Sequence, residues 1–346
     1  MSNKGHSGNF FEDFEIGARF PCPTPRVITD ADCVAYIAHT GDRSPLYCNA
    51  EGLVHPLIVF HTVLGQTVRQ ISLNAVANLG YAELLWRHPV RTGDEISTEV
   101  EIIGLKENTN RESGIVYVRT EGKNQRGEDV LSFFRWVMVR KRRKDETPFA
   151  ASPVVPILQQ EVSVDRLQGG QAPPTETRST GGRSFFEDYV VGEDIDHVDG
   201  MTINASDHMN FTRLYQNSAR VHFDALATGG KPLVYGGLVL SIGYAQSFSG
   251  LEQRGGIRAI NAGTHANPVY SGDTLYTLTQ VLEKHPLGKN EGALRLRMVV
   301  LKNERPRNGF DPWVVDPATQ KRRYQQNVVL DLDYWESMAR RSSHVA

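Results

Sequence analysis

The first half of this chain returns in its second half, and this duplication restricts the fold more than any other feature of the sequence. FFEDFEIG near the amino terminus, for example, reappears as FFEDYVVG 175 positions later. Three matched pairs of segments occur in the same order in both halves, at residues 10–17 and 185–192, at 28–42 and 203–217, and at 90–96 and 269–275. Collinear matches of this kind indicate two domains of one fold.

The duplication divides the 346 residues into two domains and a connection. We assign the domains to residues 8–143 and 183–340. Residues 144–182 between them are rich in Pro, Gly, Gln, Ser and Thr and have no hydrophobic periodicity, which is typical of a linker. This linker is long enough to cross the molecule.

Each copy predicts the same order of elements. A short helix comes first, capped by Thr29 in one copy and by Asn204 in the other, each with an aspartate three residues later. A longer apolar helix follows at residues 54–76 or 235–248. Strands are expected after it, at residues 82–89, 95–105, 114–122 and 130–140, and at 257–265, 274–283, 293–303 and 323–334. One long helix followed by antiparallel strands favours an α+β fold, with a curved antiparallel sheet wrapped around a long central helix in each copy.

Composition excludes several classes of protein. With a net charge of −2 the chain as a whole is no polyanion binder, so we expect no nucleic acid partner. No apolar run approaches the roughly 20 residues of a membrane span, and the amino terminus has no apolar signal core, so we expect no membrane partner and no secretion. The cysteines, Cys22, Cys33 and Cys48, are odd in number, which favours a reducing cytoplasm.

A metal site is not expected either. His55 and His61 are six residues apart and miss the i,i+4 spacing of paired metal ligands on a helix. The cysteines have no CxxC spacing, so a zinc site is not indicated.

Three short motifs recur in both copies. The first copy reads GDRSPLY at residues 41–47, VHPL at 54–57 and HPVRTGD at 88–94, and the second reads QNSARVH at 216–222, VYGG at 234–237 and NPVYSGD at 267–273. These motifs resemble the MaoC-like, (R)-specific enoyl-CoA hydratase family of the hot-dog fold. That family has the pattern G-D-x-N-P-x-H, a helix that opens like V-x-H-G-M, and a strand that opens close to R-P-V-x-x-G-D. The resemblance covers nearly the whole chain outside the linker and is greatest to the branch of mesaconyl-CoA hydratases, also called β-methylmalyl-CoA dehydratases.

The resemblance implies a double hot-dog fold and a hydro-lyase. The expected reaction is the reversible hydration of a short branched enoyl-CoA, in which mesaconyl-CoA (2-methylfumaryl-CoA) gives β-methylmalyl-CoA. Coenzyme A is then part of the small-molecule substrate, and no separate cofactor is expected. A homo-oligomer is expected as well. Two alternatives stay open, because the fold alone does not determine the function: a hot-dog acyl-CoA thioesterase and a non-catalytic acyl-CoA-binding module.

Neither copy has the complete catalytic pair of the family, whose Asp and His lie five residues apart on one turn. The first copy keeps the acid as Asp42 but has Tyr47 at the histidine position. The second keeps the histidine as His222 but has Asn217 at the aspartate position. The resemblance therefore implies His222, Asn217 and Asp42 as catalytic candidates. An asparagine can orient water or the thioester by hydrogen bonds, but it cannot carry a proton at neutral pH.

The second copy is better equipped for hydration of an enoyl thioester. Imidazole suits proton transfer near neutral pH, because its ordinary pKa is about 6.5. Gly236 and Gly237 open the long helix there, where backbone N–H groups and the helix dipole can stabilise an enolate oxygen. Tyr235 precedes them and is a candidate substrate contact. The first copy has Pro56 in place of the first glycine, and proline has no N–H to donate.

Other interpretations of these residues stay open. His222 could be an ordinary turn histidine, and Asp42 could cap its own turn or belong to a site shared by the two copies. Arg220 stands where the family pattern has proline. It could bind a second carboxylate on the substrate through two hydrogen bonds, or it could be a solvent-facing turn residue or a partner for Asp224.

Overall fold

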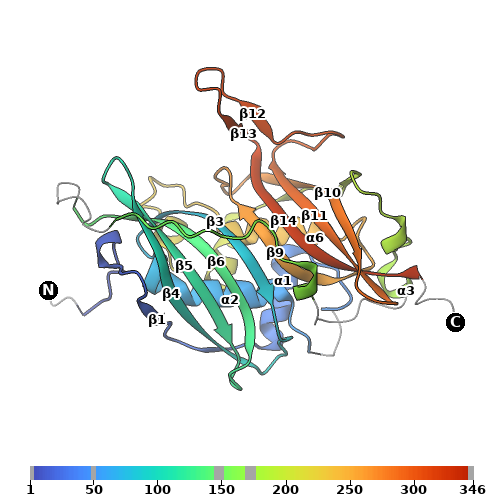
Figure 1. Cartoon of the computed structure of the whole chain (residues 1–346), viewed down its shortest axis with the longest axis horizontal. Helices are drawn as coiled ribbons and strands as arrows, with labels where there is room; N and C mark the ends of the chain where they lie inside the picture. The colour runs from blue at the N-terminus through green and yellow to red at the C-terminus, as the bar shows by residue number, and fades with distance from the viewer. Residues whose placement is uncertain (1–3, 48–51, 144–151, 168–176, 342–346) are drawn as a thin grey trace.

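The computed structural model describes residues 4–47, 52–143, 152–167 and 177–341 (Figure 1). Its helices are α1 (Asp30–Thr40), α2 (Pro56–Thr67), α3 (Thr177–Thr180), α4 (Ala205–Leu214), α5 (Arg220–Phe223) and α6 (Gly236–Gln246), with the short turns η1 (Phe11–Asp13), η2 (Val68–Ser72), η3 (Val164–Leu167) and η4 (Phe186–Asp188). The strands of the first copy are β1 (Arg19–Pro21), β2 (Arg26–Val27), β3 (Ala75–Trp86), β4 (Glu95–Glu107), β5 (Ser113–Lys123) and β6 (Asp129–Arg140). The strands of the second copy are β7 (Asp194–Asp196), β8 (Met201–Thr202), β9 (Arg254–Thr264), β10 (Thr274–Pro286), β11 (Glu291–Lys302), β12 (Trp313–Val315), β13 (Arg322–Tyr324) and β14 (Val328–Ala339).

The two copies share one sheet. Within the described residues, twelve strands pair in the order β1-β4-β5-β6-β3-β9-β14-β11-β10-β7, with β2 beside β4 and β8 beside β10. The halves meet where β3 pairs with β9, with Tyr81 opposite Gly263 and Leu85 opposite Ala259. Every pairing along this path is antiparallel, so the predicted α+β arrangement of two tandem copies is confirmed.

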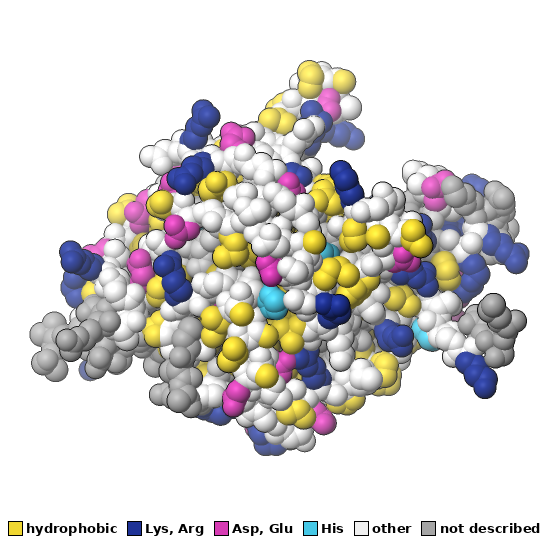
Figure 2. Space-filling model, turned by 180° about the vertical axis from the view of Figure 1, so that it is seen from behind, with side chains coloured by type: hydrophobic (Ala, Val, Ile, Leu, Met, Phe, Trp, Pro, Cys, Tyr) yellow, Lys and Arg dark blue, Asp and Glu magenta, His cyan; other side chains and the backbone are white. Residues whose placement is uncertain are grey.

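The two long helices occupy the concave side of this sheet. Helix α2 packs against β4, β5 and β6, and α6 packs against β10, β11 and β14. The helices touch through His61, whose Nε2 lies 2.8 Å from Ser241 Oγ and whose Nδ1 lies 3.2 Å from the Tyr235 hydroxyl. Figure 2 views the molecule from the side opposite to Figure 1 and shows apolar side chains near the middle of this face. In the described part of the chain, no helix is long and apolar enough to cross a membrane.

Some predicted elements differ from the structure. The helix expected at residues 54–76 ends at Thr67, and after the π turn η2 the strand β3 begins at Ala75. Neither Gly nor Pro marks this change, and a short apolar run does not distinguish a helix from a buried strand. The strand expected at 323–334 is β14, which lies five residues further on because residues 313–324 form the separate hairpin β12–β13.

The two predicted helix caps also differ from each other. Thr29 and Asp32 form a capping box at the start of α1, as predicted. At the start of α4, the Asn204 side chain makes no capping bond to the backbone. Its Nδ2 instead donates to Asp207 Oδ2 at 3.2 Å, because the amide group is turned towards the carboxylate.

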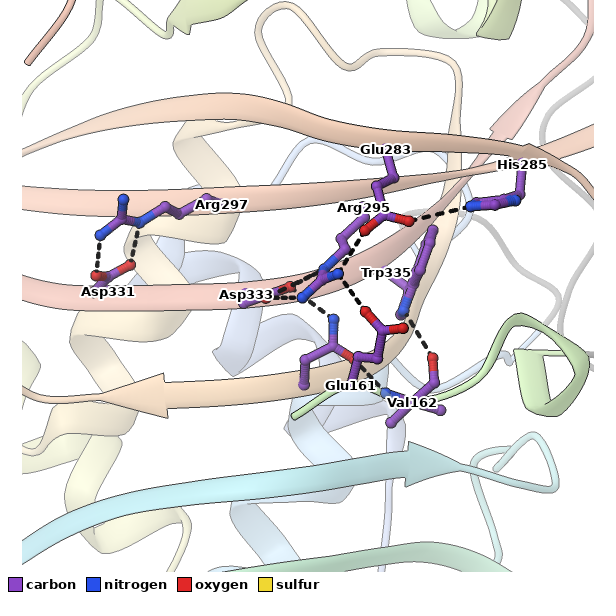
Figure 3. A network of polar contacts seen from close by, with 10 residues as sticks. Glu161, Val162, Glu283, His285, Arg295, Arg297, Asp331, Asp333 and Trp335 are labelled. Atoms are coloured by element: carbon purple, nitrogen blue, oxygen red, sulfur yellow. Dashed lines mark hydrogen bonds and ion pairs between the residues drawn. The ribbon is translucent and has the colours of Figure 1, made fainter. Parts of the chain in front are cut away.

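The described part of the linker lies across the outer face of the shared sheet. Val154 pairs with Leu105 of β4, and further along the amide of Val162 donates to Asn261 Oδ1 at 2.8 Å. Trp335 of β14 donates from its indole to the Val162 carbonyl at 3.1 Å. Figure 3 shows this contact beside Arg295, whose guanidinium reaches carboxylates on two strands and on the linker, those of Glu161, Glu283 and Asp333. The linker thus binds to both copies on the side away from the central helices.

Candidate active site

A cavity of about 500 Å³ lies between the two copies. The first copy contributes walls from α2, β3 and β6, including Phe60, Val76, Tyr81 and Arg135. The second copy contributes the turn after α4, the start of α6 and the residues that follow β9, including Asn217, His222, Gly236, Gly237, Tyr235 and His265. The structure therefore brings five residues that the sequence predicted, His222, Asn217, Tyr235, Gly236 and Gly237, to one cavity.

The turn that carries Asn217 rests directly on helix α2 of the other copy. Gln216 has a left-handed backbone with φ of 53°, which reverses the chain after α4. The carbonyl of Tyr215 approaches Gly65 so closely that a Cβ there would lie 1.8 Å from the carbonyl oxygen. Only glycine leaves room for this contact, so α2 of the first copy positions the turn of the second.

His222 is held in the protonation state of a base. Its Nδ1 lies 2.8 Å from the Leu233 carbonyl. A carbonyl can only accept a hydrogen bond, so Nδ1 carries the proton and Nε2 keeps its lone pair. Among the described residues nothing hydrogen-bonds to Nε2, and the ring lines the cavity. Burial lowers the pKa of His222 to about 4, so the ring is neutral at neutral pH.

Asn217 offers a donor to the same cavity. Its Oδ1 accepts from the amide of Ala219 at 3.4 Å, and its own backbone amide donates to the Thr212 carbonyl at 3.1 Å. Within the described residues its Nδ2 group has no hydrogen-bond acceptor, although the side chain is buried and lines the cavity. An amide donor in this position can hold a water molecule or a thioester oxygen, which is the role that the sequence analysis gave to an asparagine here.

The start of α6 presents two further donors. The first amides of a helix have no acceptor inside it. In the described part of the chain, the amides of Gly236 and Gly237 have no acceptor outside the helix either, and both residues line the cavity. Tyr235 caps this helix and lines the same cavity, with its hydroxyl 3.2 Å from His61 Nδ1. The helix dipole adds to these N–H groups, so this end of the cavity favours negative charge on a bound oxygen.

His265 is a cavity residue that the sequence analysis did not identify. It follows β9, and its ring lies against the start of α6, where a Cβ on Gly236 would be 2.7 Å from its Cε1. Burial, with a smaller effect of His222, lowers its pKa to about 4. The offset of 179 residues aligns His265 with Trp86 of the first copy. A histidine at a position where the other copy has a tryptophan was a signal in the sequence that could have identified it.

Asp42 lies elsewhere, in a buried cluster of the first copy. Its carboxylate is 3.3 Å from His55 Nε2 and 3.5 Å from Arg254 Nη2. Burial raises the pKa of Asp42, but the nearby His55 ring and the Arg254 charge outweigh it and hold the pKa below its usual range. Asp42 is not among the described residues that line the large cavity. Its contacts are those of a buried ion pair between the two copies.

The first copy's counterpart of the active site is closed. Tyr47 stands at the histidine position, and its hydroxyl lies so close to Gly256 that a Cβ there would be 2.4 Å away. Pro56 has no amide hydrogen, and the amide of Leu57 donates to His55 Nδ1 at 3.0 Å. The cavity at this position is only about 60 Å³. Within the described residues, open space and free amide donors therefore occur together in the second copy and not in the first.

Arg220 is bound to the amino-terminal half of the chain. Its guanidinium donates to Asn74 Oδ1 at 2.8 Å and to the Ser7 carbonyl at 3.4 Å. Although it stands two positions before His222, it is not among the described residues that line the cavity. Its side chain therefore ties the α5 turn to the first copy and is not directed at the proposed substrate site.

Among the described residues, no group of three or more His, Cys, Asp or Glu side chains is placed so that it could hold a metal ion. Of the three cysteines, Cys22 and Cys33 are free thiols. Cys48 lies outside the described residues.

Comparison with known proteins places the chain in a family. A family model described as mesaconyl-CoA hydratase matches residues 2–152. A curated mesaconyl-CoA hydratase of Cereibacter sphaeroides is 44% identical over 97% of this chain and 100% of that protein. The chain belongs to the mesaconyl-CoA hydratase family. A family relative from Chloroflexus aurantiacus, named β-methylmalyl-CoA dehydratase, is 42% identical over 99% of this chain and 100% of its own.

Solved structures confirm the double hot-dog fold that the family resemblance implied. A MaoC domain protein from Chloroflexus aurantiacus is 41% identical, covers 98% of this chain and 100% of its own, and superposes with a TM-score of 0.90. A conserved protein of Mycobacterium tuberculosis described as having a double hotdog fold is 21% identical, covers 96% and 99%, and has a TM-score of 0.72. The second likeness concerns the fold alone.

Proposed function

We propose that this chain is a hydro-lyase that hydrates mesaconyl-CoA reversibly to β-methylmalyl-CoA in the cavity of the second copy. One observation carries the proposal: a neutral imidazole nitrogen, an amide donor and two helix-terminal N–H groups line the same cavity. These are the groups that addition of water to an enoyl thioester needs. The names of the 44% and 42% identical relatives support this substrate.

In the proposed mechanism, Nε2 of His222 takes a proton from water while the water oxygen bonds to the β-carbon. Asn217 Nδ2 donates a hydrogen bond to that oxygen and orients it. The electron pair of the double bond moves towards the thioester oxygen, where the amides of Gly236 and Gly237 stabilise the enolate charge. The α-carbon then takes the proton back from the imidazolium of His222, and the sum is one molecule of water added.

Hydration is favoured over thioester hydrolysis by the lining of the cavity. Among the described lining residues none is Asp or Glu, so the described site offers no carboxylate as nucleophile or base for hydrolysis. Hydration needs only the imidazole and the donors that are present. A merely binding module would not need a histidine whose free nitrogen is kept unprotonated.

One assay distinguishes the three functions. The purified chain is mixed with mesaconyl-CoA or crotonyl-CoA, and the enoyl absorbance and the release of free thiol are followed together. Loss of absorbance without thiol release supports the proposal, and mass analysis should then find the product of water addition. Thiol release would indicate a thioesterase, and binding without either change would indicate an acyl-CoA-binding module.

Two further properties belong to this proposal. We expect the reaction to need no cofactor other than the coenzyme A of the substrate, so dialysis against a chelator should leave the rate unchanged. The expected homo-oligomer is tested by light scattering of the purified chain, where a monomer mass would contradict it. The expected cytoplasmic location is tested by fractionation of cells that produce the chain.

A further inference from the structure

An arginine of the first copy is buried in the wall of the substrate cavity. Arg135 lies in the middle of β6, at an inward position between Phe133 and Val137. It is only 2% exposed, yet it lines the cavity together with His222 and Asn217. A charged side chain at an inward position of an apolar strand needs a physical reason, because burial of an ion is costly.

No negative charge in the described structure balances Arg135. Its Nη2 donates to Thr67 Oγ1 at 2.6 Å, and its buried Nε has no acceptor. Burial lowers the pKa of Arg135 to about 10, and the ionisable groups that act on it in the opposite direction are the Cys22 thiol and the Tyr235 hydroxyl. Burial raises the pKa of Cys22 to about 12 and raises that of Tyr235 far above its ordinary value, so both stay neutral. The guanidinium is thus a buried cation without a counter-ion among the described residues.

Tyr81 adds a second donor to the same wall. Tyr81 of β3 lies opposite Arg135 of β6 in the sheet register, which places the two side chains on the same face. Both line the cavity, and the Tyr81 hydroxyl is buried without a hydrogen-bond partner. The Nε of Arg135 and the Tyr81 hydroxyl both lack an acceptor among the described residues, so together they form a donor pair suited to a carboxylate.

We propose that Arg135 and Tyr81 bind the free carboxylate of a dicarboxylic acyl-CoA, so that the wall from the first copy selects the substrate on which His222 of the second copy acts. This inference rests on the proposed function. In mesaconyl-CoA the free carboxylate is attached to the β-carbon that water attacks, so its binding site has to lie in the same cavity as the base. The bound carboxylate would supply the counter-ion that Arg135 lacks.

The test compares two substrates that differ at one group. 2-Methylcrotonyl-CoA has the carbon skeleton of mesaconyl-CoA with a methyl group in place of the free carboxylate. We expect Arg135→Met to lower kcat/KM for mesaconyl-CoA by roughly 10- to 150-fold, the usual effect of losing a hydrogen bond to a charged group. The rate with 2-methylcrotonyl-CoA should change by less than about threefold. Arg135→Lys should fall between, because lysine keeps the charge but not the planar fork.

Two controls separate recognition from a structural role. Arg135→Met removes an unpaired buried charge, so its Tm without ligand should equal or exceed that of the wild type. An equal fall of kcat/KM for both substrates, with a lower Tm, would overturn the inference and make Arg135 a structural residue. Arg220→Met is compared in parallel, because Arg220 is the other arginine near His222. If the preference for mesaconyl-CoA is lost there and kept in Arg135→Met, the inference is wrong.

Failure of the proposed function would leave this inference testable by binding. If the wild type hydrates neither substrate, calorimetry with succinyl-CoA and butyryl-CoA compares a dicarboxylic with a monocarboxylic ligand of equal chain length. We expect the wild type to bind succinyl-CoA more tightly than butyryl-CoA. Arg135→Met should reduce the ratio of the two affinities at least tenfold. Equal affinity of the wild type for both ligands would overturn the inference.

Discussion

The hydration rate should persist at acid pH, because the proposed general base is a buried histidine. Burial lowers the pKa of His222 from 6.5 to about 4, and the neutral ring is the form that accepts a proton from water. At pH 5 about nine tenths of such rings are neutral, against about three hundredths for a histidine with the ordinary pKa. The two cases differ by about 30-fold in active enzyme at that pH.

The assay measures kcat/KM between pH 4 and pH 8, because this quantity reports the pKa values of the free enzyme. Crotonyl-pantetheine is the suitable substrate. It lacks the 3′-phosphate of coenzyme A, which titrates near pH 6, and the free carboxylate of mesaconyl-CoA, which titrates near pH 4. Circular dichroism at each pH checks that the protein stays folded, because the buried histidines lower the free energy of unfolding as the pH falls from 6.5 towards 4. Over this range the unfolded chain takes up protons on these histidines and the folded chain does not.

A fall of the rate with a midpoint between pH 6 and pH 7, in protein that remains folded, would refute this reasoning. The base would then be a solvent-exposed histidine, or the cavity would be filled with water and its dielectric high. A midpoint near pH 4 to 5 supports the buried His222. His222→Ala should show no such acid limb in whatever activity remains.

Three substitutions test the remaining assignments. His222→Ala should lower kcat by about 100-fold or more with an unchanged circular dichroism spectrum, and retention of over a tenth of wild-type turnover would contradict its role as general base. Asp42→Asn should leave the rate nearly unchanged but lower the free energy of unfolding in urea by about 3 kcal/mol, because it breaks a buried pair with Arg254; a complete loss of activity in a stable variant would instead indicate a composite site. His265→Leu, which removes both ring nitrogens, should lower kcat/KM by about 10-fold, the effect of one lost hydrogen bond to the substrate, and wild-type kinetics would show that the ring only fills space.

The sequence was sufficient for the fold and for one half of the cavity. The repeated motifs predicted two tandem hot-dogs, and the turn at residues 216–222 with the opening of α6 contains the proposed base and the donors that line one cavity with it. These residues are neighbours along the chain, so a local pattern can reveal them. The error in α2 also comes from the local pattern, because neither Gly nor Pro stands between the end of α2 at Thr67 and the start of β3 at Ala75.

The other half of the cavity could not be predicted, because it is formed by contacts between the copies. Arg135 is nearly ninety positions before His222 in the chain, and only the shared sheet and the seating of the Tyr215 turn on Gly65 bring the two sides together. Arg220 shows the converse case. It is close to His222 in sequence, but its side chain points to Asn74. Proximity along a turn says little about which side chains share a cavity.

The closed pocket of the first copy has a consequence for ligand stoichiometry. Tyr47 and Pro56 occupy the places of the base and of the first free amide, and the space left there is about 60 Å³ against about 500 Å³ in the open cavity. A pair of identical hot-dogs would present two equivalent sites, whereas this chain should bind one acyl-CoA. A calorimetric titration should therefore saturate at one ligand per polypeptide. In a tandem chain only one of the two pockets has to bind substrate. The interior of the other can therefore hold the buried ion pair of Asp42 and Arg254, which joins the two copies.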